Sequence, residues 1–317
     1  MTSAQRYKAG AIVLAVLLFV LCAPQALQSA DQAPQFDGAN ALAVATYLAG
    51  DIGDRAAGTS GEEAAVAWLA EQFADLGYEV ELQPFQIVRN AVPYTATNVI
   101  ATKPGIAGYD TITVGAHLDT VLRTPDGLFG GPGANDNASG TAIMLESARL
   151  LSTESVSTTV KFIAFSAEEI GLTGSFYYVT HMRPIDRVRA MGMINIDCAG
   201  LGDVLGLHVF REQDLAFAEG LGIDADVISR AEFMFSDHIP FAVYGVPGVL
   251  VNHRPATGHA CGPDYHKPED TPDKLEQSAL ARAGAAVVTG IYALSEQAQP
   301  YTVHWMHFPS VGRNFDN

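Results

Sequence analysis

Residues 159–172 read T-V-K-F-I-A-F-S-A-E-E-I-G-L, and this stretch decides the fold. Its first half, Thr159 to Phe165, is a nearly continuous apolar run, which is typical of a strand buried on both faces of a sheet. Two carboxylates, Glu168 and Glu169, follow this run directly. In sheets of parallel strands, ligands bind just beyond the carboxyl ends of the strands, so the pattern predicts a polar site at that edge.

The segments on either side alternate between strand patterns and helix patterns. Apolar strands of five or six residues are expected at Asn98 to Thr102, Thr111 to Ala116, Met191 to Ile196 and Val246 to Val251. Helices are expected over Ala39 to Leu48, from Asn137 onward, and over Asp273 to Leu294. This alternation predicts an α/β fold, a single globular domain with a mostly parallel central sheet and helices on both faces.

Another helix and an edge strand are expected near the start of the domain. Ser60 followed by Glu63 is a capping-box pattern, and it predicts a helix that runs to about Leu76 and ends at Gly77. The next segment, Tyr78 to Val88, alternates between apolar and polar residues. It is expected to form an antiparallel or edge strand.

The two ends of the chain are not expected to belong to the fold. Residues 1–30 place Arg6 and Lys8 before an apolar run from Ala9 to Ala23, which is typical of a secretory signal peptide. An uncleaved N-terminal anchor is the alternative. We expect a folded domain over residues 31–299 and a C-terminal tail over residues 300–317, in a periplasmic or secreted protein.

Charge and cysteine content limit the partners of the chain. The formal net charge is −17, and it becomes −19 without the two basic residues of the first 30. Such a chain should repel nucleic acid and anionic membranes, and it is compatible with cationic groups such as free N-terminal amines. Cys198 and Cys261 lie beyond the signal segment, and either a disulfide or two buried thiols fits them.

Several segments each offer a side chain that could bind a metal ion. Besides the two glutamates they are A-H-L-D-T with His117, G-A-N-D-N-A-S-G with Asp136, N-I-D-C-A-G with Asp197, and D-Y-H-K-P-E-D-T with His266. Imidazole and carboxylate ligands suit zinc, and burying so many carboxylates without cations would be very unfavourable. The set therefore predicts a metal-assisted hydrolysis of an amide.

In the same order along residues 40–295, these motifs and S-D-H-I-P-F resemble those of the secreted two-zinc aminopeptidases of the transferrin-receptor and glutaminyl-cyclase superfamily, the bacterial leucyl-aminopeptidase type. The resemblance implies a phosphorylase/hydrolase-like zinc-peptidase fold and two Zn²⁺ ions per chain. It implies that His117 and Asp197 hold one zinc, that Glu169 and His266 hold the other, and that Asp136 bridges both. The implied substrates are peptides with a free N-terminus, hydrolysed by a monomeric enzyme.

The resemblance also implies roles around the metals. Glu168 would be the general base, and Asp119 would orient the imidazole of His117. Tyr265 would stabilise the tetrahedral oxyanion, although simple loop packing is an alternative for it. A non-proline cis peptide bond is expected between Asp136 and Asn137.

Other polar segments carry weaker expectations. Ser236, Asp237 and His238 are expected to form part of the pocket wall, since a catalytic triad needs no adjacency and no G-x-S-x-G elbow precedes them. The glycine-rich residues 128–134 lack the Lys of a phosphate loop and are expected to let the backbone approach the metals. Four further histidines, for which no partner is evident, are expected on the surface or in loops: His253, His259, His304 and His307.

Two other functions are compatible with the same fold. Glutaminyl-peptide cyclisation is an acyl transfer that uses one zinc. The resemblance implies that cyclases lose full two-metal occupancy and that the first histidine is a discriminating position, so the presence of both His117 and Asp119 favours hydrolysis. A non-catalytic peptide-binding module would have degraded ligand positions, whereas every position is filled here.

Overall fold

The computed structural model describes residues 35–106, 109–231 and 234–297, and the account below concerns the body that begins at Phe36. The expected signal segment 1–30 and the expected tail 300–317, with His304 and His307, lie outside the described residues. Those expectations therefore stay predictions.

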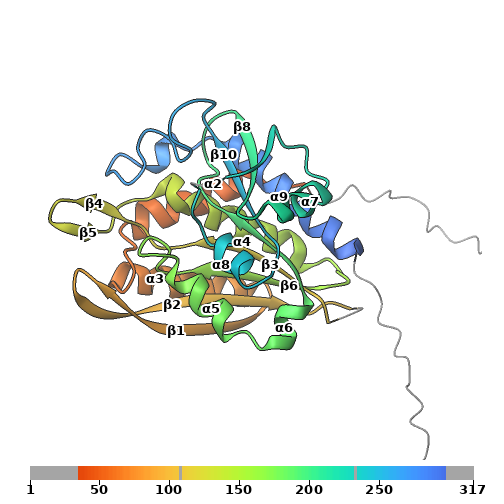
Figure 1. Ribbon diagram of the computed structural model, residues 1–317. Coiled ribbons are helices and arrows are strands. Elements are labelled where there is room, and N and C mark those ends of the chain that lie inside the picture. The colour runs from red at the N-terminus through yellow and green to blue at the C-terminus, as the bar shows by residue number, and fades with distance from the viewer. Residues whose placement is uncertain (1–34, 107–108, 232–233, 298–317) are drawn as a thin grey trace, which may run out of the picture. The chain divides into compact units, whose positions relative to one another are not determined.

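A mixed sheet of eight strands forms the centre, in the order β1-β2-β6-β3-β7-β10-β8-β9. Figure 1 shows β1 and β2 at the bottom of the view and β8 and β10 at the top. The four middle strands, β6, β3, β7 and β10, run parallel to one another, as predicted. An antiparallel β1–β2 hairpin extends one edge, and the pair β8–β9 extends the other. The strand bounds are β1 Glu79–Arg89, β2 Val92–Lys103, β3 Thr111–His117, β6 Thr159–Phe165, β7 Ala190–Ile196, β8 Val204–Val209, β9 Val227–Arg230 and β10 Gly248–Arg254. A separate hairpin joins β4 Leu122–Thr124 to β5 Gly127–Phe129.

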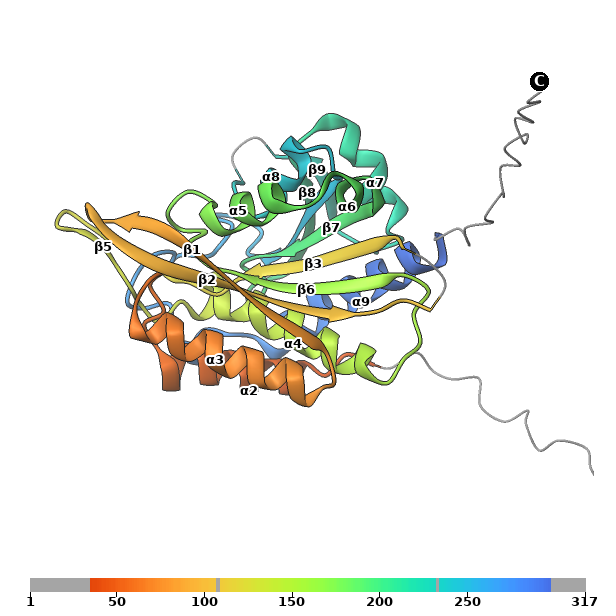
Figure 2. The ribbon, with the colours of Figure 1, turned by 90° about the horizontal axis from the view of Figure 1, so that it is seen from below.

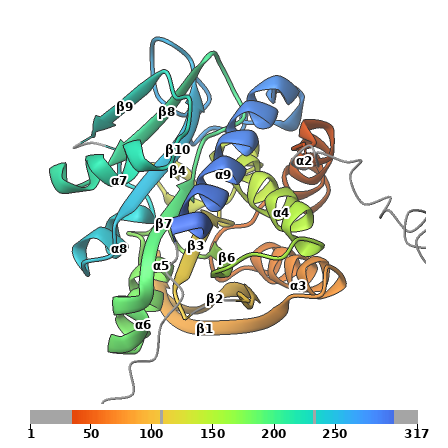
Figure 3. The same ribbon diagram turned by 90° about the vertical axis from the view of Figure 1, so that its right-hand side faces the viewer.

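Helices cover both faces of the sheet. Figures 2 and 3 show α2, α3, α4 and α9 on one face and α5, α6 and α8 on the other. The α-helix bounds are α2 Gly38–Thr46, α3 Ser60–Asp75, α4 Ser139–Ser152, α5 Thr173–His181, α6 Pro184–Arg189, α7 Leu215–Gly220, α8 His238–Val243 and α9 Gln277–Gln297. Single turns of other helix types lie at η2 Tyr47–Ile52, η3 Ala134–Ala138, η4 Glu212–Asp214 and η5 Pro272–Lys274.

The core is built from the apolar strands and the helix faces that cover them. The residues of β6 from Phe162 to Phe165 are fully buried, because helices pack on both sides of this strand. Among the described residues only α9 is apolar and long enough to cross a membrane, and 61% of its most apolar window is buried inside the domain. This burial is what a core helix requires.

Strand register brings the polar segments to one level. In the parallel pair β3–β6, His117 lies opposite Phe165, three residues before Glu168. In the pair β3–β7, Gly115 lies opposite Asn195, two residues before Asp197. The carboxyl ends of β3, β6 and β7 therefore deliver their polar residues to the same edge of the sheet.

Two helices begin at other residues than the sequence predicted. The N-cap of α3 is Thr59 rather than Ser60, and its Oγ1 accepts a hydrogen bond from Glu62 N at 3.4 Å. Glu62, not Glu63, is the residue that reaches back across the helix start, where its carboxylate accepts from Gly58 N, one residue before the N-cap. The last helix begins at Gln277 rather than Asp273, because Pro272–Lys274 form a 3₁₀ turn.

Candidate metal centre

Five proposed ligands meet at the carboxyl edge of the parallel strands. His117 ends β3, Asp197 follows β7, and Glu169 follows β6, while Asp136 and His266 come from the loops that precede α4 and follow β10. Their ligand atoms form two groups, each within 4.8 Å: His117, Asp136 and Asp197, and Asp136, Glu169 and His266. The resemblance implies these same two groups for two metals, and their role as metal ligands stays a prediction.

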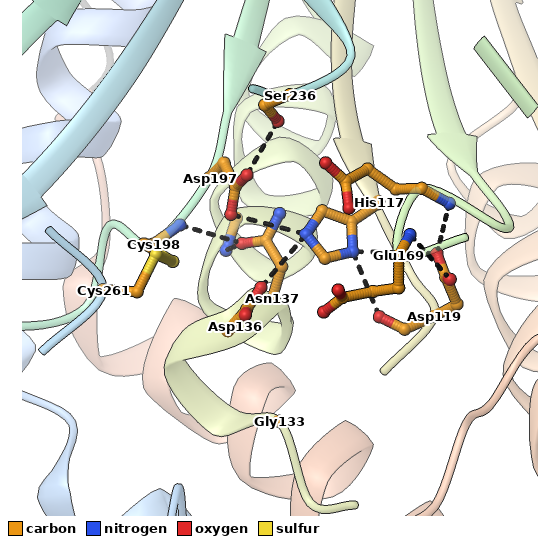
Figure 4. Close-up of polar contacts among 12 residues, drawn as sticks. His117, Asp119, Gly133, Asp136, Asn137, Glu169, Asp197, Cys198, Ser236 and Cys261 are labelled. Atoms are coloured by element: carbon orange, nitrogen blue, oxygen red, sulfur yellow. Dashed lines mark hydrogen bonds and ion pairs between the residues drawn. A yellow bond between two sulfur atoms is a disulfide. The ribbon is translucent and has the colours of Figure 1, made fainter. Parts of the chain in front are cut away.

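Asp136 belongs to both groups and directs one oxygen to each. Its Oδ1 lies 3.2 Å from His117 Nε2, and its Oδ2 lies 3.3 Å from His266 Nε2. Asp197 Oδ1 is 3.4 Å from His117 Nε2, and Glu169 Oε2 is 3.0 Å from His266 Nε2 (Figure 4 shows the His117 side). One carboxylate between two imidazole–carboxylate groups is the arrangement of a bridging ligand.

The donor atoms fit divalent cations. Four of them are buried without a hydrogen-bond partner among the described residues: Asp136 Oδ2, Glu169 Oε1, Asp197 Oδ1 and His266 Nε2. Buried polar atoms in folded proteins are almost always hydrogen-bonded; leaving even a neutral one unsatisfied costs about 2–7 kcal/mol, and burying an ionised carboxylate without compensating charge costs more. Zinc prefers imidazole nitrogen and carboxylate oxygen, so a pair of zinc ions would satisfy this set.

The backbone that carries Asp136 has an unusual path. The Asp136–Asn137 peptide bond is cis, as predicted. Gly133 precedes it with φ +50°, and a Cβ at Gly133 would lie 2.4 Å from the carbonyl oxygen of Asp136. The glycine at position 133 therefore permits a close approach to the carbonyl of Asp136, and an approach of the segment to the metals stays a prediction.

Asp119 joins His117 to the two glutamates. The Nδ1 of His117 lies 3.1 Å from the backbone carbonyl of Asp119 and 3.7 Å from its carboxylate. The Asp119 carboxylate instead accepts hydrogen bonds from Glu168 N at 3.1 Å and Glu169 N at 3.3 Å. The imidazole is thus oriented mainly by the carbonyl, while the carboxylate positions the glutamate turn (Figure 4).

Carboxylates control the protonation of the centre. Burial lowers the pKa of His117, but the neighbouring carboxylates, Asp197 first, outweigh it and raise that pKa well above its ordinary value. Burial raises the pKa of Glu168 well above the usual range, and the charge of Glu169 adds to this rise. A carboxylate with a raised pKa is suited to accept and return a proton near neutral pH.

Ser236 holds one ligand, which the sequence interpretation of a pocket wall did not specify. Its hydroxyl donates to Asp197 Oδ2 at 2.7 Å and accepts from Asn195 Nδ2 at 2.7 Å, which leaves Asp197 Oδ1 facing His117. The adjacent Asp237 is fully buried, and burial raises its pKa to about 7.

Two further residues hold the loop that carries Asp136, and the sequence analysis did not identify either of them. The carboxylate of Asp270 accepts hydrogen bonds from Asn135 N at 2.9 Å and Asp136 N at 3.0 Å. Buried Arg55 donates to the carbonyl oxygens of Leu118 at 2.9 Å and Gly133 at 3.0 Å, among others. Asp270 follows His266 by four residues, which is a usable signal, whereas nothing in the sequence distinguishes Arg55.

A cavity of about 190 Å³ adjoins the metal centre. Cys198 and Cys261 line it and form a disulfide, which decides between the two alternatives left open by the sequence. Tyr265 also lines it, and burial raises the pKa of its hydroxyl, which therefore keeps its proton as a hydrogen-bond donor.

One of the two described histidines differs from its expected surroundings. His259 is exposed in a loop, as expected, where it stacks on the ring of Tyr265 at 4.1 Å, accepts from Cys261 N through Nδ1, and lines the cavity. His253 is buried in β10 rather than exposed, and its Nδ1 lies 2.9 Å from the carbonyl oxygen of Leu201. Both have partners that the sequence did not show.

The α/β fold and the two imidazole–carboxylate groups that share Asp136 at the sheet edge place this chain in the class of metallohydrolases. The chain belongs to peptidase family M28, whose sequence profile matches residues 98–291.

Similar proteins agree with this family assignment. The chain is 32% identical over 224 residues to aminopeptidase YwaD of Bacillus subtilis, a match that covers 66% of this chain and 47% of YwaD. It is 29% identical over 300 residues to leupeptin-inactivating enzyme 1 of Streptomyces exfoliatus, covering 86% and 66% of the two chains. The chain thus spans about half to two thirds of the length of these curated relatives.

Solved structures share the fold. A zinc aminopeptidase from Bacillus subtilis, BSAP, superimposes with a TM-score of 0.72 at 21% identity and covers 85% of this chain and 98% of its own. A glutaminyl cyclase from Bacteroides thetaiotaomicron gives a TM-score of 0.68 at 21% identity, with 82% and 99% covered.

Proposed function

We propose that this chain is a zinc-dependent aminopeptidase, an exopeptidase that hydrolyses the first peptide bond of peptides with a free N-terminus. The observation that supports this proposal most is the sharing of Asp136 between two imidazole–carboxylate groups. In this proposal His117 and Asp197 hold one Zn²⁺ ion, Glu169 and His266 hold the other, and Asp136 bridges them.

The chain's own groups supply the proton transfers. Two zinc ions in the site would lower the pKa of a water molecule and polarise the substrate carbonyl. Glu168 is the general base: it takes a proton from the attacking water and returns it to the leaving amine. Its backbone is held by the Asp119 carboxylate, which keeps the side chain at the centre.

Tyr265 and the surrounding charge bind the substrate. The Tyr265 hydroxyl, protonated and at the cavity wall, is placed to donate a hydrogen bond to the developing oxyanion. The carboxylates that line the cavity favour a protonated N-terminal amine over an N-blocked peptide.

We further propose export to the periplasm or the medium. A disulfide between Cys198 and Cys261 supports this location, because such bonds persist in oxidising compartments.

A zinc count combined with a substrate panel tests the function. We expect two zinc ions per chain, turnover of aminoacyl 4-nitroanilides, and no turnover of the N-acetylated substrates. Full zinc content without turnover of any free-amine substrate would instead favour a non-catalytic binding module. A glutaminyl peptide separates hydrolysis from cyclisation, because an aminopeptidase releases free glutamine and a cyclase leaves the peptide at full length minus ammonia.

A further inference from the structure

Arg123 contacts two proposed ligands of the same metal. It lies in β4, in the hairpin that extends away from the central sheet (Figure 1). Its Nε donates a hydrogen bond to His266 Nδ1 at 3.0 Å. Its Nη2 donates to the backbone carbonyl of Glu169 at 3.1 Å and to Glu169 Oε2 at 3.4 Å. The Arg123 side chain is 52% exposed and that of Glu169 is 4% exposed, so a solvated cation reaches a buried ligand here.

The two imidazoles of the centre have opposite partners at Nδ1. His117 Nδ1 lies 3.1 Å from the carbonyl oxygen of Asp119, which can only accept a hydrogen bond. A ligand histidine usually donates its second N–H to such an acceptor, which leaves Nε2 free to bind the ion. His266 Nδ1 instead faces a guanidinium, which is always protonated and can only donate. Nδ1 of His266 is therefore an acceptor, and the proton of its neutral ring lies on Nε2.

This position of the proton conflicts with metal binding at His266. Nε2 lies 3.3 Å from Asp136 Oδ2 and 3.0 Å from Glu169 Oε2, so it is the nitrogen that would bind the ion. Coordination uses the lone pair of Nε2 and places the ring proton on Nδ1. Two donors, Nδ1–H and the guanidinium N–H, would then face each other. Binding of an ion to Nε2 therefore breaks the contact between His266 and Arg123.

Charge acts in the same direction as the proton. Glu169 Oε2 lies 3.0 Å from His266 Nε2 and 3.4 Å from Arg123 Nη2, so one oxygen serves both the ligand group and the guanidinium. A divalent ion bound at this oxygen would repel the positive charge of Arg123. In the other group, the carboxylate of Asp197 is held by the neutral hydroxyl of Ser236 at 2.7 Å. The two groups therefore differ in the charge of the side chain that contacts a ligand carboxylate.

We propose that Arg123 competes with the metal ion of the Glu169/His266 group. Its guanidinium lowers the affinity of this group for Zn²⁺, and it is released from His266 when the ion binds. Arg123 thus acts on the zinc affinity through two ligands and not on the reacting atoms. The proposal rests on the proposed function, because it takes Glu169 and His266 as zinc ligands.

Zinc affinities of two arginine variants test the proposal. They are measured by competition with a zinc-binding chelator, on the full chain from which zinc has been removed. Methionine keeps the length of the side chain and removes its charge and its donors, so Arg123→Met should bind the more weakly held Zn²⁺ about tenfold more tightly than the parent. The control is Arg183→Met, because Arg183 is 74% exposed and pairs with Asp186 on the surface. Its two zinc affinities should stay within about twofold of the parent values.

Nitrogen NMR of the His266 ring identifies the group and needs no variant with altered zinc affinity. We expect the ring proton on Nε2 in the zinc-free parent and on Nδ1 after Zn²⁺ is added. A ring proton already on Nδ1 in the zinc-free parent would overturn the proposal. Equal zinc affinities in the parent and in Arg123→Met, with two ions bound to each, would overturn it as well and leave the proposed function intact. A parent that binds no Zn²⁺ would refute the proposed function and this proposal together.

Discussion

Glu168 is close to the proposed ligands, but in the proposed function it acts as the general base and does not bind a metal. We predict that Glu168→Gln lowers kcat on an aminoacyl anilide by about 10²–10⁴-fold, because the amide cannot accept a proton from water. Zinc content should remain that of the unaltered protein. Steady-state kinetics and elemental analysis measure the two quantities.

The exposed Glu63→Gln on α3 is the matched control and should leave both kinetics and zinc content unchanged. A Glu168→Gln protein that keeps most of its turnover at full zinc content would remove Glu168 from the mechanism. One that loses zinc would show that Glu168 is a ligand, as its nearness to His117 and Glu169 allows.

At the scale of single residues, sequence predicted the groups that carry charge at strand ends. His117, Glu169 and Asp197 each follow an apolar run, so their position at the sheet edge could be inferred from topology alone. Ser236 and Arg55 could not be found in this way. They act through hydrogen bonds to residues distant in the chain, and only the folded structure brings those partners together.

At the scale of elements, the loop before α4 is held by the loop that carries His266. Asp270 accepts hydrogen bonds from two successive amides, one of which belongs to Asp136. We predict that Asp270→Asn weakens zinc binding by about 10–100-fold, the usual effect of altering a group that orients metal ligands. The variant keeps one accepting oxygen, but its amide NH₂ replaces the other. That NH₂ is a donor and would face a backbone N–H, so one of the two hydrogen bonds is lost.

Competition with a zinc-binding dye measures this affinity. The control is Asp264→Asn in the same loop, whose carboxylate only pairs with the surface Lys274, and its zinc affinity should stay within about twofold. An Asp270→Asn affinity equal to that of Asp264→Asn would contradict the positioning role.

The disulfide joins two further elements of the site. Cys198 directly follows Asp197, and Cys261 lies in the loop that leads to His266, at a sequence separation of 63 from Cys198. We predict that the double variant Cys198→Ser/Cys261→Ser has a free energy of unfolding lower by about 2–4 kcal/mol, because the unfolded chain regains freedom. Urea unfolding of both proteins, zinc-free and with the native disulfide intact in the parent, checks this value; equal midpoints would refute it.

Element prediction succeeded where the hydrophobic pattern was long and failed where elements were short. The strands β3, β6 and β7 were found within a residue of their bounds, because buried parallel strands are continuous apolar runs. The helices α5 to α8 and the strands β8 and β9 were missed. Most of them span six residues or fewer, too few for a period to appear.

At the scale of the whole molecule, acid stability depends on neutral histidines in the core. Burial, followed by the charge of Arg254, lowers the pKa of His208 to about 4. In the unfolded chain the same residue takes up a proton below its ordinary pKa of about 6.5. His208 therefore contributes stability that is present above about pH 6.5 and is lost as the pH falls toward 4.

The direction of this pH dependence can be tested by comparing the parent with His208→Gln. Between about pH 7.5 and about pH 5, the parent should lose about 1–2 kcal/mol more unfolding free energy than His208→Gln, which cannot titrate. Glutamine can still bond with Ser229, the partner of His208 Nδ1, so the variant keeps that contact at neutral pH. Urea unfolding of the zinc-free proteins at both pH values isolates the effect from metal release. Equal losses in the two proteins would mean that His208 is not the residue through which acid destabilises the fold, and the neutral His238 on α8, whose pKa is lowered to about 3 by burial, would be the next to test.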